Sequence, residues 1–284
     1  MVEGDALNEL RQLPQVLGGI DARSVELATR VFSRLAPSVV CVDSLESAEM
    51  VKLANNAYRD VSFAFANEFA LVCERWNLDA VNVIEAANMG YPRNPIPLPS
   101  PGVGGFCLTK DPLIYARAGS EKGFEPVLAA AGRAVNQRMV AHVARKVLDF
   151  LSRHGKDPAT CELFLLGFAF KGSPATSDTR DSSTLLLLPL LRRAGLKARG
   201  FDPVVSAEKI ASFGVHPVSL DEGFEGADVV VVMNNHPTYK DMDLFSLLSR
   251  MRRPGLLLDG WHMFARRDVE QIPGIEYGGL SGAL

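Results

Sequence analysis

The sequence has few cysteines, and none of them are arranged as a disulfide framework or a metal site would require. Its 284 residues contain only four cysteines, far apart and without a CxxC pair, and five histidines that also lack metal-ligand spacing. This pattern excludes small disulfide scaffolds and zinc modules. Isolated thiols suit a reducing compartment, so we expect a cytoplasmic protein with no bound metal.

Long apolar runs and an excess of charge of one sign are also missing. No apolar stretch reaches the ~18 residues that a membrane span needs, and residues 1–5 do not resemble the start of a signal peptide. The net charge of −3 gives no indication of the excess of positive charge that binding to nucleic acid or to an anionic membrane surface requires. We therefore expect partners that are neither nucleic acid nor membrane.

The sequence is long enough for more than one domain, and 47% of its residues are hydrophobic, which is enough to form the cores of these domains. Residues 1–43 predict two strands and a crossover helix, which is too little for a sheet domain. Residues 44–155 predict long helices, and residues 156–284 alternate strands with helices. The sequence therefore predicts an α/β protein: the remnant of an N-terminal α/β domain, a central helical domain, and a C-terminal Rossmann-like, doubly wound parallel sheet.

Apolar periodicity and the positions of glycine and proline locate the expected elements. Expected helices span residues 24–35, 45–76, 77–87, 111–118, 125–153, 181–193 and 244–250. Expected strands span residues 15–20, 39–42, 163–166, 197–201, 215–218, 229–233 and 256–259. No GxGxxG motif follows the strand at 163–166. We expect an anionic nucleotide near Lys171 and Arg180, where a strand ends and positive side chains follow.

One stretch, Gly102 to Pro112, concentrates residues suited to chemistry. The proline-rich run 94–101 leads into it and cannot be helix interior. We therefore expect a stiffened loop that delivers Cys107 to a pocket opened by glycines. Lys110 nearby would favour the thiolate, the reactive form. The alternative is a small buried hydrophobe, which is our interpretation of the other three cysteines.

The longest expected helix carries a polar stripe beside its apolar face. Lys52, Asn56, Arg59 and Asn67 fall on one side at ~100° per residue, with Phe63 among them. A solvated helix face is the alternative, although Glu and Lys are commoner than Asn on such faces. The stripe therefore supplies a second set of candidate site residues.

Together these motifs resemble the UDP-glucose/GDP-mannose dehydrogenase family of nucleotide-sugar 6-dehydrogenases. The segments that carry the resemblance are Glu49 to Asn56 with Asn67-Glu68, Gly104 to Asp111, and Gly167 to Lys171 followed by Asp178 to Ser182. They occur in the family's order and at its spacing. Residues 3–20 look most like members acting on UDP-N-acetylmannosamine or UDP-N-acetylglucosamine.

The resemblance implies NAD-dependent, four-electron oxidation of C6 of a UDP-N-acetylhexosamine to the uronic acid, for surface polysaccharide precursors. The family uses a cysteine thiohemiacetal and a thioester that water hydrolyses, a covalent route that divides one difficult step into two. The two long helices expected in the middle region also suggest a homodimer through the first of them. Most of the family's N-terminal NAD-binding domain is missing from the sequence, so we expect the chain alone to be inactive.

The resemblance also implies roles for individual residues. The expected catalytic residues are Cys107, Lys52, Asn56, Asp111 and Glu3, with Cys107 as the nucleophile and Lys52 stabilising charge on the reacting oxygen. The expected cofactor-binding residues are Lys110 and Arg180. The expected substrate-binding residues are Arg93, Gly104, Gly105, Asn67, Phe170 and Lys171, with Arg93 reaching across the dimer. For Arg180, an ordinary ion pair with Asp178 or Asp181 is the alternative.

Two other functions stay open on the sequence. One is a non-catalytic module that binds UDP-sugar and dimerises. The other is a thiol enzyme of another class, such as a Cys-His hydrolase, although no histidine precedes His142. The chain also departs from the family at Trp261-His262-Met263, where many members carry an arginine.

Overall fold

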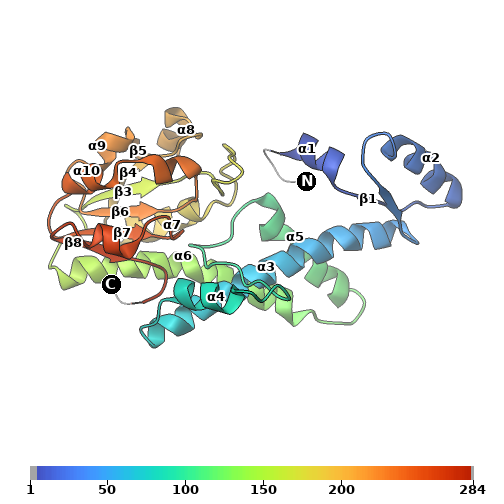
Figure 1. Ribbon diagram of the computed structural model, residues 1–284, viewed down its shortest axis with the longest axis horizontal. Helices are drawn as coiled ribbons and strands as arrows, with labels where there is room; N and C mark the ends of the chain where they lie inside the picture. Colours follow the sequence, from blue (N-terminus) through green and yellow to red (C-terminus); the bar gives the residue numbers. More distant parts are fainter. Residues whose placement is uncertain (1–4, 283–284) are drawn as a thin grey trace.

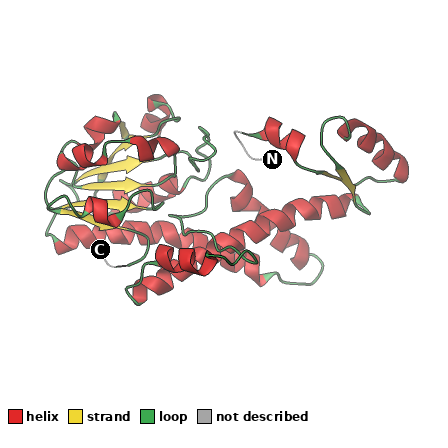
Figure 2. Cartoon of the chain, in the orientation of Figure 1, coloured by secondary structure: helices red, strands yellow, loops and turns green. Residues whose placement is uncertain are grey.

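Two long helices, α3 (Leu45–Arg75) and α6 (Val127–Arg153), pack side by side through the middle of the protein. The computed structural model describes residues 5–282. It has a small α/β unit at the start of α3 and a parallel sheet over the C-terminal part of α6 (Figure 1). Helices flank that sheet on both sides and dominate the middle of the chain (Figure 2).

The remaining helices are α1 (Ala6–Gln12), α2 (Ala22–Phe32), α4 (Ala80–Asn88), α5 (Phe106–Ser120), α7 (Ser183–Arg193), α8 (Ala207–Ser212), α9 (Leu220–Phe224), the 3-10 helix η1 (Pro237–Asp241), α10 (Leu244–Ser249) and α11 (Arg266–Val269). The strands are β1 (Gln15–Leu17), β2 (Val39–Cys41), β3 (Glu162–Leu166), β4 (Lys197–Phe201), β5 (His216–Pro217), β6 (Val229–Val232), β7 (Gly255–Asp259) and β8 (Ile275–Gly278).

The C-terminal sheet is doubly wound, as the sequence predicted. Its six strands are parallel and follow the order β5-β4-β3-β6-β7-β8, so the chain starts in the middle and winds outward in both directions. Strands β6 and β7 are buried along their whole length because their residues are almost all Val and Leu. The predicted α/β class, with a helical middle and this sheet, is confirmed.

Each face of the sheet has its own core. Phe150 of α6 and Leu187 of α7 pack on one face, and Phe224 of α9 and Leu248 of α10 pack on the other. Because α6 belongs to both the sheet's core and the helical middle, the two regions are joined by one continuous helix. No helix within residues 5–282 combines the length and apolarity that crossing a bilayer would require.

Several predicted boundaries are wrong for local reasons. The loop predicted to carry Cys107 is instead the first turn of α5, because Gly105 acts as the N-cap with φ 89°. The helix predicted from Asp181 starts two residues later, because Asp181 itself adopts a left-handed backbone with φ 52°. The strand predicted over 15–20 ends at Leu17, just before two glycines.

Other differences are small or concern short elements. The helices predicted from residues 77 and 125 begin at Ala80 and Val127, and the strand predicted over 215–218 is only His216–Pro217. Elements α8, α9, α11 and β8 were not predicted. Each has six residues or fewer, too short for a helical or alternating pattern to be recognised.

Candidate functional site

Helices α3 and α5 bring together three residues that the sequence selected as catalytic. Nδ2 of Asn56 donates a hydrogen bond to Oδ2 of Asp111 at 2.5 Å, and Nζ of Lys52 lies 4.0 Å from the same oxygen. Lys110 makes an ion pair with the other carboxylate oxygen. Lys52 and Asn56 project from the same side of α3 because they lie one helical turn apart.

Asp111 is 3% exposed, yet it is held in the ionised form. Burial alone raises the pKa of this carboxyl. The hydrogen bonds from Lys110 and Asn56 and the charges of Lys110 and Lys52 outweigh burial, so the pKa is lowered. An ionised carboxylate beside ammonium groups is able to hold a proton or orient a water molecule.

Cys107 lies in the first turn of α5 and is exposed. The N–H groups of a first turn have no partner within the helix, and the helix dipole favours negative charge there. The structure therefore contradicts the alternative of a buried Cys107.

The other three cysteines differ from one another. Cys73 and Cys161 are buried, and burial raises the pKa of both thiols, to about 12 for Cys161, which fits the predicted structural role. Burial predicted for Cys41 is wrong, because this residue is exposed on the two-stranded β1–β2 sheet.

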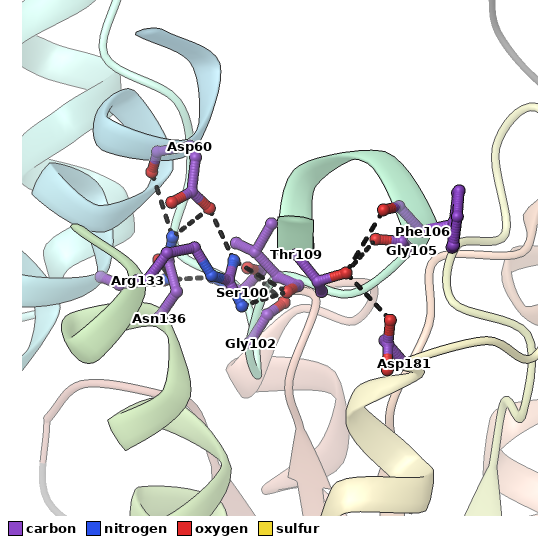
Figure 3. Close-up of polar contacts among 11 residues, drawn as sticks. Asp60, Ser100, Gly102, Gly105, Phe106, Thr109, Arg133, Asn136 and Asp181 are labelled. Atoms are coloured by element: carbon purple, nitrogen blue, oxygen red, sulfur yellow. Dashed lines mark hydrogen bonds and ion pairs between the residues drawn. The ribbon is translucent and has the colours of Figure 1, made fainter. Parts of the chain in front are cut away.

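Close packing explains the two glycines before α5. A Cβ atom on Gly104 would lie 2.4 Å from the carbonyl oxygen of Asp181, and one on Gly105 would lie 2.7 Å from the ring of Phe170. Oγ1 of Thr109 donates to Oδ2 of Asp181 at 2.9 Å and to the carbonyl of Gly105, as Figure 3 shows. The first turn of α5 is thus fastened to the segment that leads into α7.

Two adjoining cavities lie near the start of α5, and Cys107 lines the first of them. The first, about 180 Å³, is lined on its polar side by Lys52, Asn56, Arg59, Cys107, Lys171 and Arg180. Four of these side chains are cationic, which suits an anionic ligand such as a diphosphate. The second cavity, about 240 Å³, shares Arg59, Gly104, Leu108, Phe170 and Lys171 with the first.

The second cavity has mainly apolar walls. Phe63, Leu98, Val103, Phe170 and Trp261 line it. Nε1 of Trp261 donates to the carbonyl of Met233 at 2.9 Å, so the indole presents a fixed apolar face. Apolar walls beside a few polar groups are typical of sites for small organic ligands.

Several predicted site residues do not line either cavity. Asn67 is fully buried and bonded to Ser100 and Asn136, so the structure places it behind the loop. Arg93 is exposed, with its guanidinium 5.8 Å from the ring centroid of Tyr91. Glu3 lies outside the described residues.

The two predicted cofactor residues lie around one ring. Nζ of Lys110 is 4.9 Å from the ring centroid of Phe106, and the guanidinium of Arg180 is also 4.9 Å from it. Lys110 does not line the cavities. Arg180 lines the first cavity and also makes the alternative ion pair, with Asp178 at 2.6 Å.

Sequence reasoning missed other residues of the site. Arg59 and Phe63 lie on the polar stripe of α3, where the sequence indicates no individual role for either, and both line cavities. Asp60 and Arg133 form a buried ion pair behind the loop at 2.7 Å. Asp60 follows Ala57 by three residues and so lies on the apolar side of α3. A charged residue on that side indicates a buried partner of opposite charge, so the sequence did contain a sign of this pair.

The described residues do not form a dinucleotide site of their own. The β1–β2 unit has only two strands. In the C-terminal sheet, the N–H groups of Phe168 and Ala169 directly follow β3, where a doubly wound fold binds a pyrophosphate. Both already donate to Oδ2 of Asp202, at 2.6 and 3.0 Å. An internal carboxylate therefore occupies that position.

The fold and the site define a class of protein: a doubly wound, nucleotide-binding type of sheet joined to a helical unit that presents a thiol among cations. Two family models match. The model for the central domain of the UDP-glucose/GDP-mannose dehydrogenase family matches residues 46–138, and the model for its UDP binding domain matches residues 164–266. The chain belongs to the UDP-glucose/GDP-mannose dehydrogenase family, which confirms the predicted resemblance.

Curated relatives are similar over most of the chain. The UDP-N-acetyl-D-mannosamine dehydrogenase of Pyrococcus horikoshii is 33% identical over 92% of this chain and 59% of its own length. The enzyme of the same name from Methanocaldococcus jannaschii is 34% identical over 86% of this chain and 53% of its own length. The chain thus spans between half and three-fifths of the length of these relatives.

Solved structures have the same fold. The structure of the UDP-D-ManNAc dehydrogenase from Pyrococcus horikoshii matches with a TM-score of 0.85 and 30% identity, over 99% of this chain and 62% of that one. An NDP-N-acetyl-D-galactosaminuronic acid dehydrogenase from Methanosarcina mazei matches with a TM-score of 0.86 and 26% identity, over 99% and 60%.

Proposed function

We propose that this chain is part of a cytoplasmic nucleotide-sugar 6-dehydrogenase that oxidises C6 of a UDP-N-acetylhexosamine, UDP-ManNAc or UDP-GlcNAc, to the uronic acid for surface polysaccharide precursors. The observation that carries the proposal is the exposed Cys107 in one cavity with Lys52 and Asn56, both of which lie beside the ionised Asp111. The names of the relatives support the substrate class.

The protein's own residues account for the covalent part of the reaction. The thiolate of Cys107 adds to the carbon of a C6 aldehyde, and the former carbonyl oxygen gains the negative charge. Lys52 and Asn56 stabilise that oxygen. After oxidation to the thioester, water attacks the carbonyl carbon, Asp111 holds the proton of the water, and the thiolate of Cys107 leaves. Glu3 is assigned a supporting role in this hydrolysis by resemblance alone.

The substrate is proposed to lie across both cavities. Arg59, Lys171 and Arg180 would face the diphosphate, because cationic side chains form charge-assisted hydrogen bonds with phosphate oxygens. Phe170 and the glycines Gly104 and Gly105 would contact the nucleotide or sugar closely.

NAD is the proposed oxidant of the complete protein, and it would accept a hydride in each oxidation step. Lys110 and Arg180 are the residues of this chain proposed to contact it. The described residues form no dinucleotide site by themselves, so the rest of that site would come from outside them. We therefore expect the 284-residue chain by itself to give no steady NADH production from UDP-N-acetylmannosamine.

The two family-model matches, over residues 46–138 and 164–266, support a division of the chain into domains. We propose residues 1–43 as part of an NAD-binding domain, residues 44–155 as the central domain with the catalytic cysteine, and residues 156–284 as the UDP-sugar-binding domain. We also propose a homodimer through α3, in which Arg93 reaches the partner's substrate and Asn67 supports the loop before Cys107.

A non-catalytic UDP-sugar-binding module is the second candidate, because the described residues lack a dinucleotide site. Calorimetry with UDP-sugar and alkylation of Cys107 by iodoacetamide distinguish the two. For an enzyme, we expect UDP-sugar binding together with alkylation that is faster than at Cys41 and slowed by bound UDP-sugar. Tight binding with an inert Cys107 would favour the module.

A charge variant tests the proposed diphosphate contacts. Lys171→Met should weaken UDP-sugar binding by about ten- to a hundredfold, because a charge-assisted hydrogen bond contributes about 1.5–3 kcal/mol. Lys209→Met is the matched control, since Lys209 lies 5.3 Å from the ring centroid of Phe213, much as Lys171 lies 5.6 Å from that of Phe170. Equal affinities in the two variants would argue against the assigned cavity.

A further inference from the structure

The loop that leads into α5 is held from behind by a buried polar network between α3 and α6, drawn in Figure 3. Arg133 donates from Nη1 and Nη2 to the carbonyl oxygen of Val103 at 3.3 and 3.4 Å. The backbone N–H of Ser100 donates to Oδ1 of Asn67 at 2.8 Å. Both anchored loop residues lie close in sequence to Gly105, the N-cap of α5.

These anchors depend on one ion pair. Nη1 of Arg133 lies 2.7 Å from Oδ1 of Asp60, and Nδ2 of Asn136 donates to the same oxygen at 2.8 Å. Asn136 in turn accepts a hydrogen bond from Asn67 at 2.9 Å. None of the four side chains belongs to a residue more than 5% exposed, so the network is continuous and shielded from solvent.

Stabilising the fold is not the main role that the chemistry of this ion pair indicates. Oδ2 of Asp60 and Nε of Arg133 have no hydrogen-bond partner in the part of the chain that the structure describes. Burial raises the pKa of Asp60, against the opposing effects of Arg133 and Asn136. Apolar side chains of similar volume often stabilise a protein as well as a buried ion pair does. What apolar side chains would not supply is a donor to the Val103 carbonyl.

The network and the catalytic candidates share one turn of α3. Asn56 and Asp60 lie four residues apart and both are buried. Asn56 donates to Asp111 at 2.5 Å, and Asp60 holds Arg133. The loop before Cys107 and the carboxylate after it are therefore both fixed relative to the same helical turn.

We propose that Asp60 and Arg133 are positioning residues that fix the Val103 carbonyl and thereby hold the first turn of α5, with Cys107, in place. The inference rests on the proposed role of Cys107 as nucleophile. The first turn depends on this support because its N-cap, Gly105, has no side chain with which to cap the helix. The network acts through the backbone and does not touch the substrate.

The experiment measures the rate of alkylation of Cys107 by iodoacetamide at pH 7. It uses the full chain carrying Cys41→Ser, because Cys41 is the other exposed cysteine among the described residues. The double variant Asp60→Leu with Arg133→Met removes both charges, so neither is left buried alone, and it should stay folded. We expect about two- to fivefold slower alkylation, because a frayed first turn no longer places its N–H groups beside the reacting sulfur.

Two further variants make the outcome specific. Lys156→Met removes one member of the pair with Asp228, which lies at the amino end of the sheet, and should leave alkylation unchanged. Arg133→Lys keeps a cationic donor and should restore part of the rate. An unchanged rate in the double variant, or an equal slowing in Lys156→Met, would overturn the proposal.

This readout needs neither NAD nor turnover. If the double variant alkylates normally while UDP-sugar still binds and protects Cys107, the positioning role fails and the dehydrogenase function stands. If Cys107 does not react faster than Cys41 in the chain that retains Cys41, the proposed function fails first. The two failures are therefore distinguishable.

Discussion

Two buried carboxylates behave oppositely because their partners differ. Asp111 accepts hydrogen bonds from Lys110 and Asn56 and lies near the charge of Lys52, so its pKa is lowered despite burial. Asp60 is more deeply buried, with one oxygen unpaired among the described residues, and its pKa is raised. A carboxyl whose pKa is lower in the folded than in the unfolded chain stabilises the fold at any pH above its unfolded pKa. Asp111 therefore stabilises the fold at neutral pH, and this contribution is lost as the pH falls through its folded pKa.

The buried His262 makes the free energy of unfolding depend on pH, and a substitution at this position tests the effect. Burial lowers its pKa from 6.5 to about 4, against smaller opposing effects of Asp79 and the Pro99 carbonyl. The unfolded chain therefore binds more protons between pH 6.5 and 4, so stability falls as pH falls through this range. From pH 7 to pH 5 the loss from this residue is about 2 kcal/mol.

We expect His262→Asn to remove that part of the loss in urea unfolding at the two pH values. Asparagine tolerates the left-handed backbone at this position, where φ is 53°. The exposed His216→Asn is the control and should leave the pH slope as it was. A slope unchanged in His262→Asn would contradict the assignment, while a residual slope is expected from buried His142, whose pKa is also lowered by burial.

At the scale of elements, α5 determines the site. It presents Cys107 in its first turn and Asp111 one turn later, and it packs against α3, which presents Lys52 and Asn56. The sequence predicted these residues to meet but placed Cys107 in a loop. The start of α5 depends on Gly105, which has a positive φ and whose lack of a Cβ leaves room for the ring of Phe170. No local sequence pattern records that close approach.

A glycine variant tests whether this contact fixes the helix start. Gly105→Ala should lose stability both from the positive φ and from the ring of Phe170, 2.7 Å from the new Cβ. Gly123→Ala is the control, since φ there is +79° and nothing lies within 4 Å. We expect about 1–2 kcal/mol for Gly123→Ala and about 1–3 kcal/mol more for Gly105→Ala in urea unfolding.

Equal losses in the two variants would mean that Phe170 moves aside freely. In that case the close approach of α5 to the loop after β3 does not depend on the absence of a side chain. Alkylation of Cys107 in the same variants reports whether the first turn has shifted. Only Gly105→Ala should change it, because Gly123 lies beyond the other end of α5.

At the scale of the molecule, α3 has an exposed apolar stripe. Tyr58, Phe65 and Val72 of α3 and Trp76 at its C-cap are each at least 50% exposed. Their spacing of seven, seven and four residues puts them on one side of the helix. Exposed apolar side chains that gather on one side mark an interaction surface. This stripe supports the proposed homodimer through α3.

The association state of two variants tests that surface. Phe65→Lys should weaken self-association by roughly tenfold or more in sedimentation equilibrium, because an ammonium buried at an interface is costly. Phe124→Lys alters a side chain that is 68% exposed but lies between α5 and α6, off the stripe, and should have no effect. A monomeric parent chain would count against the dimer.

How much of the site was predictable differs from residue to residue. Cys107, Lys52 and Asn56 were found because a thiol after glycines and a polar helical stripe are local patterns. Arg133 was not found, because its partner Asp60 lies on another helix, 73 positions away. In the sequence, a single Arg in an amphipathic helix has the same pattern around it whether its side chain is solvated or buried.

The sequence alone determined the parallel sheet, the long helices and the family, because periodicity and motifs are properties of neighbouring residues. Tertiary structure decided where α5 begins, which carboxylates stay ionised and which of the candidate residues reach the cavities. These features depend on burial and on partners far apart in the chain. Burial sets the cost of each charge, and folding alone determines which groups are close enough to offset it.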